Sequence, residues 1–235
     1  MPEEIEIKEG LQGVYITKSK ICKVDGSQGK LYYRGYRIED LADKSSYEEV
    51  CYLLLYGRLP KKGELNDFNR KLKDERKISE DIKLLIKRFS NAQTLDVLRT
   101  AMSALSSYDN APYSADEKEN NDKAIRIVSK TATIAAAISR VKQNKEIIEP
   151  DESLGHAENF LYMLTGSKPD KDAAKLMDIM FILHAEHSSN ASTFATLVAC
   201  STLADIYAGV TAGVAALKGP LHGGADEAAI KMMKE

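Results

Sequence analysis

Two histidines close to a run of small polar residues are the first candidates for chemistry. His184 and His187 are three residues apart at the end of an apolar stretch, and Ser, Asn and Thr side chains dominate residues 188–193. Residues at this spacing share a helical face, and the end of a helix favours a protonated imidazole. The pattern is suited to a ligand that carries a carboxylate. The plain alternative, two helix-end histidines satisfied by backbone carbonyls, stays open.

A third histidine, His222, stands in a glycine-rich turn. Gly219-Pro220 ends the preceding helix, and Gly223-Gly224 permits unusual backbone angles before the next one. The start of a helix disfavours imidazolium, so we expect a neutral imidazole whose ring N–H donates a hydrogen bond. Such a donor can polarise a carbonyl and stabilise an enol. The alternatives are an ordinary loop histidine and a phosphate cradle, although no nucleotide fingerprint accompanies the turn.

The histidines also raise the question of a metal site. Zinc proteases of the helical type need His at i and i+4 with Glu after the first, and the segment His184–His187 does not have that spacing. A third ligand would have to be His222 or a distant carboxylate. We therefore expect no metal, and a zinc-binding helical protein is the least favoured alternative.

The elements that must position these residues are predicted to be helices, preceded by a small β-hairpin. Residues 14–17, 21–24 and 30–33 are short β-type runs, and Asp25-Gly26 supplies turn residues between the last two. From Ile38 onward, apolar residues recur at helical spacing. The predicted fold class is all-α.

Polar residues mark where several of these helices begin. Ser46 is followed three residues later by Glu49, which is the spacing of a capping box, and predicts a helix over residues 47–56 that Gly57 ends. A further helix is predicted over 171–186, so that its end carries the first two histidines.

Residues 193–217 are rich in Ala, Val, Leu, Thr and Gly and predict one helix of small residues. Gly209 and Gly213 are four apart and would let another helix approach closely, in the core or at a subunit interface. The core is the plainer interpretation. A membrane span is not expected, because Asp205 lies near the middle of the stretch and a carboxylate at that depth is costly.

Charge and cysteine usage narrow the class of protein. The 235 residues have a net charge of −2, from 33 Lys and Arg against 35 Asp and Glu. No long basic block is present, so we expect no binding to nucleic acid. Cys22, Cys51 and Cys200 are scattered and form no CxxC pair, which is typical of reduced thiols in a cytoplasmic protein.

Four segments resemble the citrate synthase family and follow one another in the family order. They are Asp25–Leu41, similar to DG..G.L.YRGY.IEDL; Leu53–Pro60, LLLYGRLP; His184–Thr193, similar to HA(D/E)HxxNAST; and Lys218–Glu227, similar to KGPLHGGANE. The resemblance spans the whole chain and is to the shorter bacterial and archaeal type. One departure is Asp226, which stands where Asn is common.

The resemblance implies an acyltransferase of the tricarboxylic acid cycle that condenses acetyl-CoA with oxaloacetate to give citrate and CoA. No bound cofactor is implied, because the coenzyme A thioester is a substrate. The resemblance implies that His222 hydrogen-bonds the acetyl thioester carbonyl, that His187 binds and polarises oxaloacetate, and that Ser192 orients His222. His184 would support the site from behind. No residue is assigned to coenzyme A.

The resemblance also implies a domain division and partners. Residues 1–218 are expected to form the helical large domain of citrate synthase type, and residues 219–235 the hinge and first helix toward a small domain. The family's catalytic Asp, its second catalytic His and its carboxylate-binding arginines would lie downstream. We therefore expect this chain to be inactive alone, with a separate C-terminal half as a candidate partner. A homodimer packed through the small-residue helix is also implied.

Two alternative functions stay open. A 2-methylcitrate synthase uses propionyl-CoA and shares these motifs. A non-catalytic helical dimerisation module would ignore oxaloacetate, and replacing His187 would then change nothing.

Overall fold

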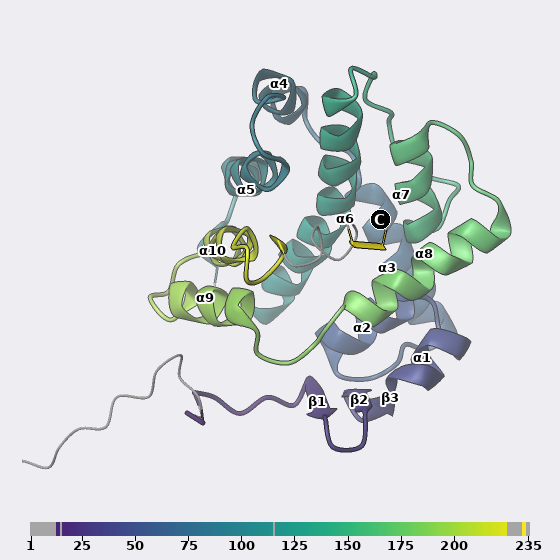
Figure 1. Cartoon of the computed structure of the whole chain (residues 1–235), viewed down its shortest axis with the longest axis vertical. Helices are drawn as coiled ribbons and strands as arrows, with labels where there is room; N and C mark the ends of the chain where they lie inside the picture. Colours follow the sequence, from purple (N-terminus) through teal and green to yellow (C-terminus); the bar gives the residue numbers. More distant parts are fainter. Residues whose placement is uncertain (1–12, 15, 115, 225–231, 234–235) are drawn as a thin grey trace, which may run out of the picture.

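The computed structural model describes residues 13–14, 16–114, 116–224 and 232–233, which form a helical protein with one small sheet (Figure 1). The strands are β1 Cys22–Asp25, β2 Lys30–Tyr33 and β3 Tyr36–Arg37. The helices are α1 Ile38–Lys44, α2 Tyr47–Tyr56, α3 Lys62–Asp74, α4 Glu80–Arg88, α5 Thr94–Ala104, the 3-10 helix η2 Leu105–Tyr108, α6 Glu117–Lys142, α7 His156–Thr165, α8 Lys171–His184, α9 Ala191–Cys200 and α10 Ile206–Leu217. The prediction of an all-α fold is confirmed.

The predicted hairpin is the core of a three-stranded antiparallel sheet. β1 and β2 pair with Cys22 opposite Tyr33, and β3 adds Tyr36 opposite Tyr33. Residues directly opposite each other in a sheet point to the same face, so Cys22 and Tyr33 are presented together. The turn requires Gly29, whose φ is +61°. Of the first predicted β-type run, the described residues 14, 16 and 17 lie outside any strand.

The capping box at the start of α2 is confirmed. The Ser46 hydroxyl accepts a hydrogen bond from the Glu49 backbone N–H at 3.3 Å, and the Glu49 carboxylate accepts one from the Ser46 N–H at 2.8 Å. Gly57 ends the helix in the left-handed conformation, with φ +81°. Local polar chemistry thus fixes both ends of α2.

The long helix α6 lies at the centre of the fold and is shared by two apolar clusters. One cluster joins α4, α5, α6 and α10, and its larger buried residues are Ile82, Ile86, Val97, Met102, Ile134, Ile138 and Tyr207. A second joins α6 to α2 and α3. A third cluster packs the sheet and α1 against α2 and α8 through Tyr33, Ile38, Leu41, Val50, Leu53 and Ile182. The sheet is therefore attached to α8, the helix that precedes the histidine segment.

The prediction of one helix over 193–217 is wrong, because a turn divides the stretch into α9 and α10. Leu203 in the turn has φ +64°, a value that no helix accommodates. Asp205 is the N-cap of α10, and its carboxylate accepts a hydrogen bond from the Ala208 N–H at 2.9 Å. Asp205, which the sequence places near the middle of one long helix, therefore marks the start of α10.

The two small-residue helices lie side by side (Figure 1). A Cβ placed on Gly213 would lie 2.7 Å from Thr196 Oγ1, and one on Gly209 would lie 2.5 Å from Cys200 Sγ. Both glycines therefore serve a close approach to α9 within the same chain, which supports the core interpretation.

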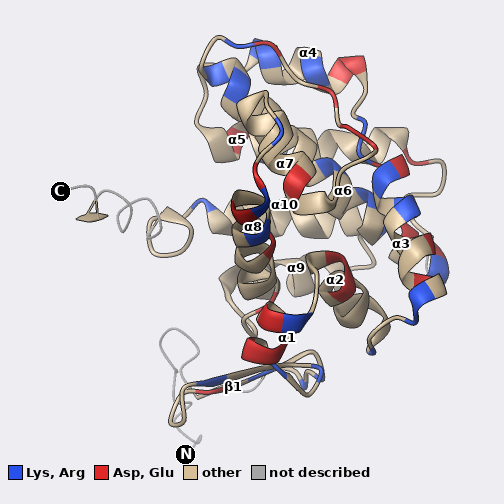
Figure 2. Ribbon diagram, turned by 90° about the vertical axis from the view of Figure 1, so that its right-hand side faces the viewer, with Lys and Arg blue, Asp and Glu red and all other residues tan. Residues whose placement is uncertain are grey.

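The surface carries charges of both signs. Basic and acidic side chains both occur along α3, for example (Figure 2). None of the helices in the described ranges combines the length and the apolar character needed to cross a membrane.

Candidate active site

The structure brings together two of the three predicted site residues. Ser192 lies in the first turn of α9, and His222 lies in the turn that follows α10. The Ser192 hydroxyl and His222 Nε2 are 2.8 Å apart, within hydrogen-bond distance, although 30 residues separate them. The two sequence segments that could carry chemistry therefore meet at one point.

The first turn of α9 is stabilised by its N-cap residue, Asn190. The Asn190 side-chain oxygen accepts a hydrogen bond from the Thr193 N–H at 2.8 Å. Further N–H groups of this first turn have no partner inside the helix, so the end of α9 that carries Ser192 favours negative charge. This environment suits a ligand with a carboxylate group.

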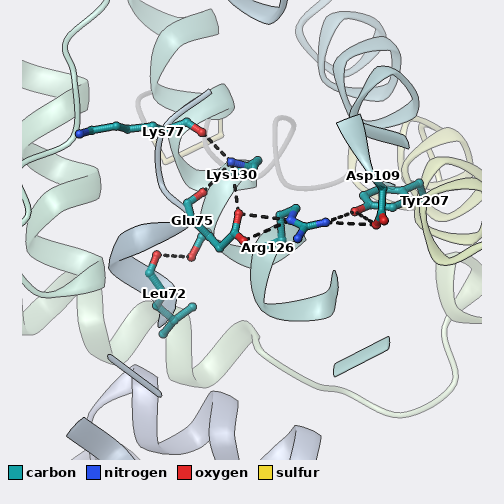
Figure 3. A network of polar contacts seen from close by, with 8 residues as sticks. Leu72, Glu75, Lys77, Asp109, Arg126, Lys130 and Tyr207 are labelled. Carbon is teal, nitrogen blue, oxygen red and sulfur yellow. Dashed lines mark hydrogen bonds and ion pairs between the residues drawn. The ribbon is translucent and has the colours of Figure 1, made fainter. Parts of the chain in front are cut away.

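The helix that leads to His222 is anchored at its start by a polar network (Figure 3). Tyr207 in the first turn of α10 is buried and donates a hydrogen bond to Asp109 Oδ2 at 2.7 Å. Arg126 of α6 contacts the same carboxylate at 3.1 Å and the Tyr207 hydroxyl at 3.2 Å. Burial, followed by the hydrogen bond to Asp109, raises the pKa of Tyr207 to about 12.

The same network continues to the end of α3. Arg126 Nε lies 3.2 Å from Glu75 Oε2, and Lys130 Nζ donates to the Glu75 carbonyl at 3.0 Å. Although burial opposes ionisation, hydrogen bonds from Ala111 N–H and Tyr207, together with the charge of Arg126, hold the pKa of Asp109 below its usual value. The start of α10 is thus fixed to two other helices.

The end of α10 is held by an ion pair. Lys218 Nζ lies 2.8 Å and 2.7 Å from the two carboxylate oxygens of Asp96 on α5. The hydrogen bond from Lys218 is the main cause that lowers the pKa of Asp96. The turn then folds back on the helix, because the Gly223 N–H donates to the Leu217 carbonyl at 2.9 Å. A Cβ at Gly223 would lie 2.5 Å from that carbonyl oxygen, so only glycine fits.

The prediction that His184 and His187 share a helical face is wrong. α8 ends at His184, and His187 lies exposed in the loop before α9. His184 Nδ1 is 2.7 Å from the Met180 carbonyl oxygen, so the plain alternative of a backbone-satisfied helix-end histidine holds for His184. Among the described residues, no hydrogen bond joins His187 to Ser192 or His222.

Sequence reasoning missed two residues that position the site. Asp96 is 122 residues from its partner Lys218, and no local pattern marks the pair. Tyr33 hydrogen-bonds the end of α8 and explains why that helix stops before His187. The only signal in the sequence was that Lys218 and Tyr33 both fall inside the segments of family resemblance.

The arrangement can supply hydrogen-bond donors to a carbonyl substrate. If the Ser192 hydroxyl donates to His222 Nε2, the ring proton is on Nδ1, which becomes a donor to a ligand. In the described part of the chain, no group of three or more His, Cys, Asp or Glu side chains is placed to hold a metal ion.

Comparison with known proteins identifies the family. The model described as "Citrate synthase, C-terminal domain" matches residues 10–235. Citrate synthase of Haloferax volcanii is 42% identical over 98% of this chain and 62% of its own length. 2-Methylcitrate synthase of Mycobacterium tuberculosis is 41% identical over 99% of this chain and 59% of its own length.

A solved structure gives the same result for the fold. The citrate synthase of Thermoplasma acidophilum, solved as a ternary complex with carboxymethyl coenzyme A and oxaloacetate, is 35% identical. It superposes with a TM-score of 0.92 over 96% of this chain and 60% of its own. The chain spans about three-fifths of the length of the relatives it matches. By the family model, the relatives and the fold alike, the chain belongs to the citrate synthase family.

Proposed function

We propose that this chain provides the helical large-domain part of a citrate synthase, which condenses acetyl-CoA with oxaloacetate to give citrate and CoA. The observation that carries the proposal is the 2.8 Å contact between Ser192 and His222 in a member of this family. The relative solved with oxaloacetate and a coenzyme A analogue supports the two substrates. Coenzyme A enters as part of a substrate, and no bound cofactor is proposed.

The chemistry needs two hydrogen-bond donors. Removing a proton beside a thioester places negative charge on the thioester oxygen, and a positioned donor lowers that barrier. A second donor must polarise the ketone of oxaloacetate, so that its carbon accepts the new bond. We propose His187 and His222 for these two tasks, with Ser192 holding His222.

The resemblance assigns the thioester to His222 and oxaloacetate to His187, and we propose the same division for this chain. The Ser192 hydroxyl lies 2.8 Å from His222 Nε2, so the other ring nitrogen can donate to the thioester carbonyl. His187 is exposed in the loop before α9, where a second substrate can reach it.

Calorimetric titration with oxaloacetate tests this division. His187→Ala should weaken oxaloacetate binding at least about tenfold, the loss expected for one hydrogen bond to a charged ligand. His222→Ala should keep the affinity within about threefold. The reverse pattern would exchange the roles of the two histidines.

Activity is tested by thiol release from acetyl-CoA and oxaloacetate. A protein-only blank is needed, because Cys22, Cys51 and Cys200 are free thiols. We expect oxaloacetate-dependent turnover when the chain is supplied with a separately produced C-terminal half, and its loss in His222→Ala. Absence of turnover together with absence of oxaloacetate binding would overturn the proposal.

One relative favours a second candidate activity. Because a 2-methylcitrate synthase is 41% identical to this chain, propionyl-CoA is tested in the same assay. A higher kcat/KM for propionyl-CoA would select that activity. The dimerisation-module alternative loses its main support, since Gly209 and Gly213 contact α9 of the same chain.

We also propose a homodimer in the cytoplasm. The apolar side chains of Leu197, Val198 and Leu203, on α9 and the turn after it, are 42%, 53% and 89% exposed. Such a patch supports association with a second copy. The three unpaired thiols fit a reducing compartment. Residues 219–235 are proposed as the hinge toward a small domain.

A further inference from the structure

A tyrosine of the small sheet reaches the end of the helix that precedes His187. Tyr33, on β2, has no exposed surface, and its hydroxyl is 3.1 Å from the Ile182 carbonyl oxygen and 3.2 Å from that of Leu183. The same hydroxyl oxygen accepts a hydrogen bond from the Glu186 N–H at 3.2 Å. One side chain therefore satisfies backbone groups on both sides of a helix end, where carbonyls otherwise lack partners.

These contacts decide where α8 stops. The Ala185 N–H bonds to the Ile182 carbonyl at 3.3 Å, three residues back, which tightens the last turn. The next N–H, that of Glu186, leaves the helical ladder and bonds to Tyr33 instead. His187 follows one residue later. The direction of the chain at His187 is thus set by the sheet as well as by α8.

The backbone directly after His187 adopts a conformation that needs support. Ser188 has φ +70°, in the left-handed region that few residues other than glycine adopt. The Ser188 N–H donates to Glu186 Oε1 at 2.7 Å, and its carbonyl accepts from the Asn190 N–H at 3.0 Å. Such conformations persist where surrounding contacts over-determine them, and they cluster at functional sites.

A second residue of the sheet shares the face that carries Tyr33. Cys22 pairs opposite Tyr33 on the neighbouring strand, so both side chains lie on one face of the sheet. Burial, and then the charge of Glu186, raises the pKa of the Cys22 thiol, while the Ser188 backbone N–H opposes the shift. The charge of Glu186 is thus felt on this face of the sheet, and Tyr33 supplies the hydrogen bonds that join the sheet to the loop.

We propose that Tyr33 is a positioning residue for His187, acting through its hydrogen bonds to the end of α8 and the Glu186 N–H. This proposal rests on the proposed function in one respect, which is that His187 binds a substrate. Its role is to fix the direction in which the His187 imidazole is presented, without contact to the substrate itself. The N-terminal sheet thereby becomes part of the site.

The first test compares Tyr33→Phe with a matched control, Tyr36→Phe. Both variants remove one tyrosine hydroxyl from the same sheet, and Tyr36 is 40% exposed. The readout is the set of imidazole carbon–proton signals of the ligand-free chain, recorded below the unfolding temperature of each variant. Tyr33→Phe should move or broaden the His187 signal and leave His156 unchanged, and Tyr36→Phe should change neither. A His187 signal that is the same in Tyr33→Phe as in the original chain would overturn the proposal.

A measurement on the unsubstituted chain keeps the proposal testable should Tyr33→Phe not fold. The Glu186 amide should be protected from hydrogen exchange about as well as amides inside α8, because its partner is fully buried. Exchange as fast as that of an unbonded loop amide would contradict the proposal.

Substrate titration then separates this inference from the proposed function. In the original chain, the His187 or His222 signals should respond to oxaloacetate with an acetyl-CoA analogue. Tyr33→Phe should require about tenfold more ligand for the His187 response, with His222 unaffected. An unchanged His187 midpoint would overturn the role of Tyr33. A lack of any histidine response in the original chain would contradict the proposed function, and the ligand-free comparison would still decide on Tyr33.

Discussion

The contact between Ser192 and His222 has a direction that matters for its chemistry. A hydroxyl that donates to Nε2 selects the tautomer with the proton on Nδ1, and so turns the other side of the ring into a donor. The imidazole would then polarise a carbonyl without giving up a proton. Ser192 contributes by orienting the ring.

Removing that hydroxyl should therefore weaken ligand binding without unfolding the chain. We expect Ser192→Ala to lower the affinity for an acetyl-CoA analogue about five- to tenfold, the effect of one lost hydrogen bond. Ser201→Ala is the matched control, because its exposed hydroxyl at the other end of α9 donates a hydrogen bond to the Val198 carbonyl and lies outside the site. Equal affinities of the two variants, measured by calorimetry, would remove Ser192 from the site.

A histidine outside the site provides a pH signature of the fold. His156, at the start of α7, is 4% exposed, and its Nδ1 has no hydrogen-bond partner among the described residues. Burial, followed by the charge of Arg76, lowers its pKa to about 3. The folded state therefore keeps this imidazole neutral where an unfolded chain would protonate it.

The stability of the chain should fall as the pH drops below about 6.5, the ordinary pKa of histidine. Between that pH and about 3, the unfolded state binds one proton that His156 does not bind in the folded state. This group alone contributes a slope of up to about 1.4 kcal/mol per pH unit. Urea unfolding at pH 6.5, 5.5 and 4.5 should show a flatter dependence for His156→Gln. A parallel dependence for both proteins would disprove the buried neutral state.

At the scale of elements, the pairing of α9 with α10 places Ser192 beside His222. Gly213 faces α9, and the Cβ of any other residue there would lie 2.7 Å from Thr196 Oγ1 and 3.4 Å from the Ser192 carbonyl. The Thr196 hydroxyl itself bonds to the Ser192 and Gly209 carbonyls. Small residues on α10 thus set the position of the serine.

Gly213→Ala should destabilise the chain although alanine is the better helix former. The propensity gain is about 1 kcal/mol, whereas overpacking a close contact costs about 1–3 kcal/mol. We expect a net loss of about 1 kcal/mol in urea unfolding. Gly63→Ala in the first turn of α3 is the control. No group of the described residues beyond its own stretch of helix lies within 4 Å of the added Cβ, so this variant should be neutral or stabilising. Higher stability of Gly213→Ala would contradict the close packing.

The elements that local chemistry defines could be predicted from the sequence, and those that distant contacts define could not. The α2 helix follows from Ser46, Glu49 and Gly57, which act within one turn of the helix ends. The break between α9 and α10 was missed because Asp205 lies inside a long run of helix-compatible residues. It was interpreted as a charge within one helix, whereas it is the N-cap of α10. The early end of α8 depends on Tyr33, about 150 residues away, and no spacing rule reveals it.

The candidate site was predictable only in part. The roles of its residues came from the family resemblance. Spacing alone also allowed a pair of helix-end histidines that bond to backbone carbonyls, and this alternative is correct for His184. The contact of Ser192 with His222 depends on how α9 packs against α10. Neither sequence segment, taken alone, predicts that packing.

At the scale of the whole molecule, the helix that leads to His222 is tied to two other helices of the core. Its start is bonded to α6 through Arg126, and its end to α5 through Asp96. These two attachments lie within the chain itself. We therefore expect the site geometry to persist when a second copy associates through the exposed apolar side chains of α9.

A charge in that apolar patch should dissociate the proposed homodimer. Val198→Glu should shift sedimentation equilibrium from dimer to monomer, because burying an unpaired carboxylate at an interface is costly. Leu84→Glu is the control, since Leu84 is 61% exposed on α4. A dimer that survives Val198→Glu, or one that Leu84→Glu disrupts equally, would place the interface elsewhere.

The most direct test of the account is a titration of the 235-residue chain with oxaloacetate, followed through its four histidine imidazole signals. We predict that the His187 signal moves in a saturable way and that the buried His156 signal stays fixed. A His187 signal that does not respond, or a response shared equally by His156, would contradict the assignment of this site to a citrate synthase reaction.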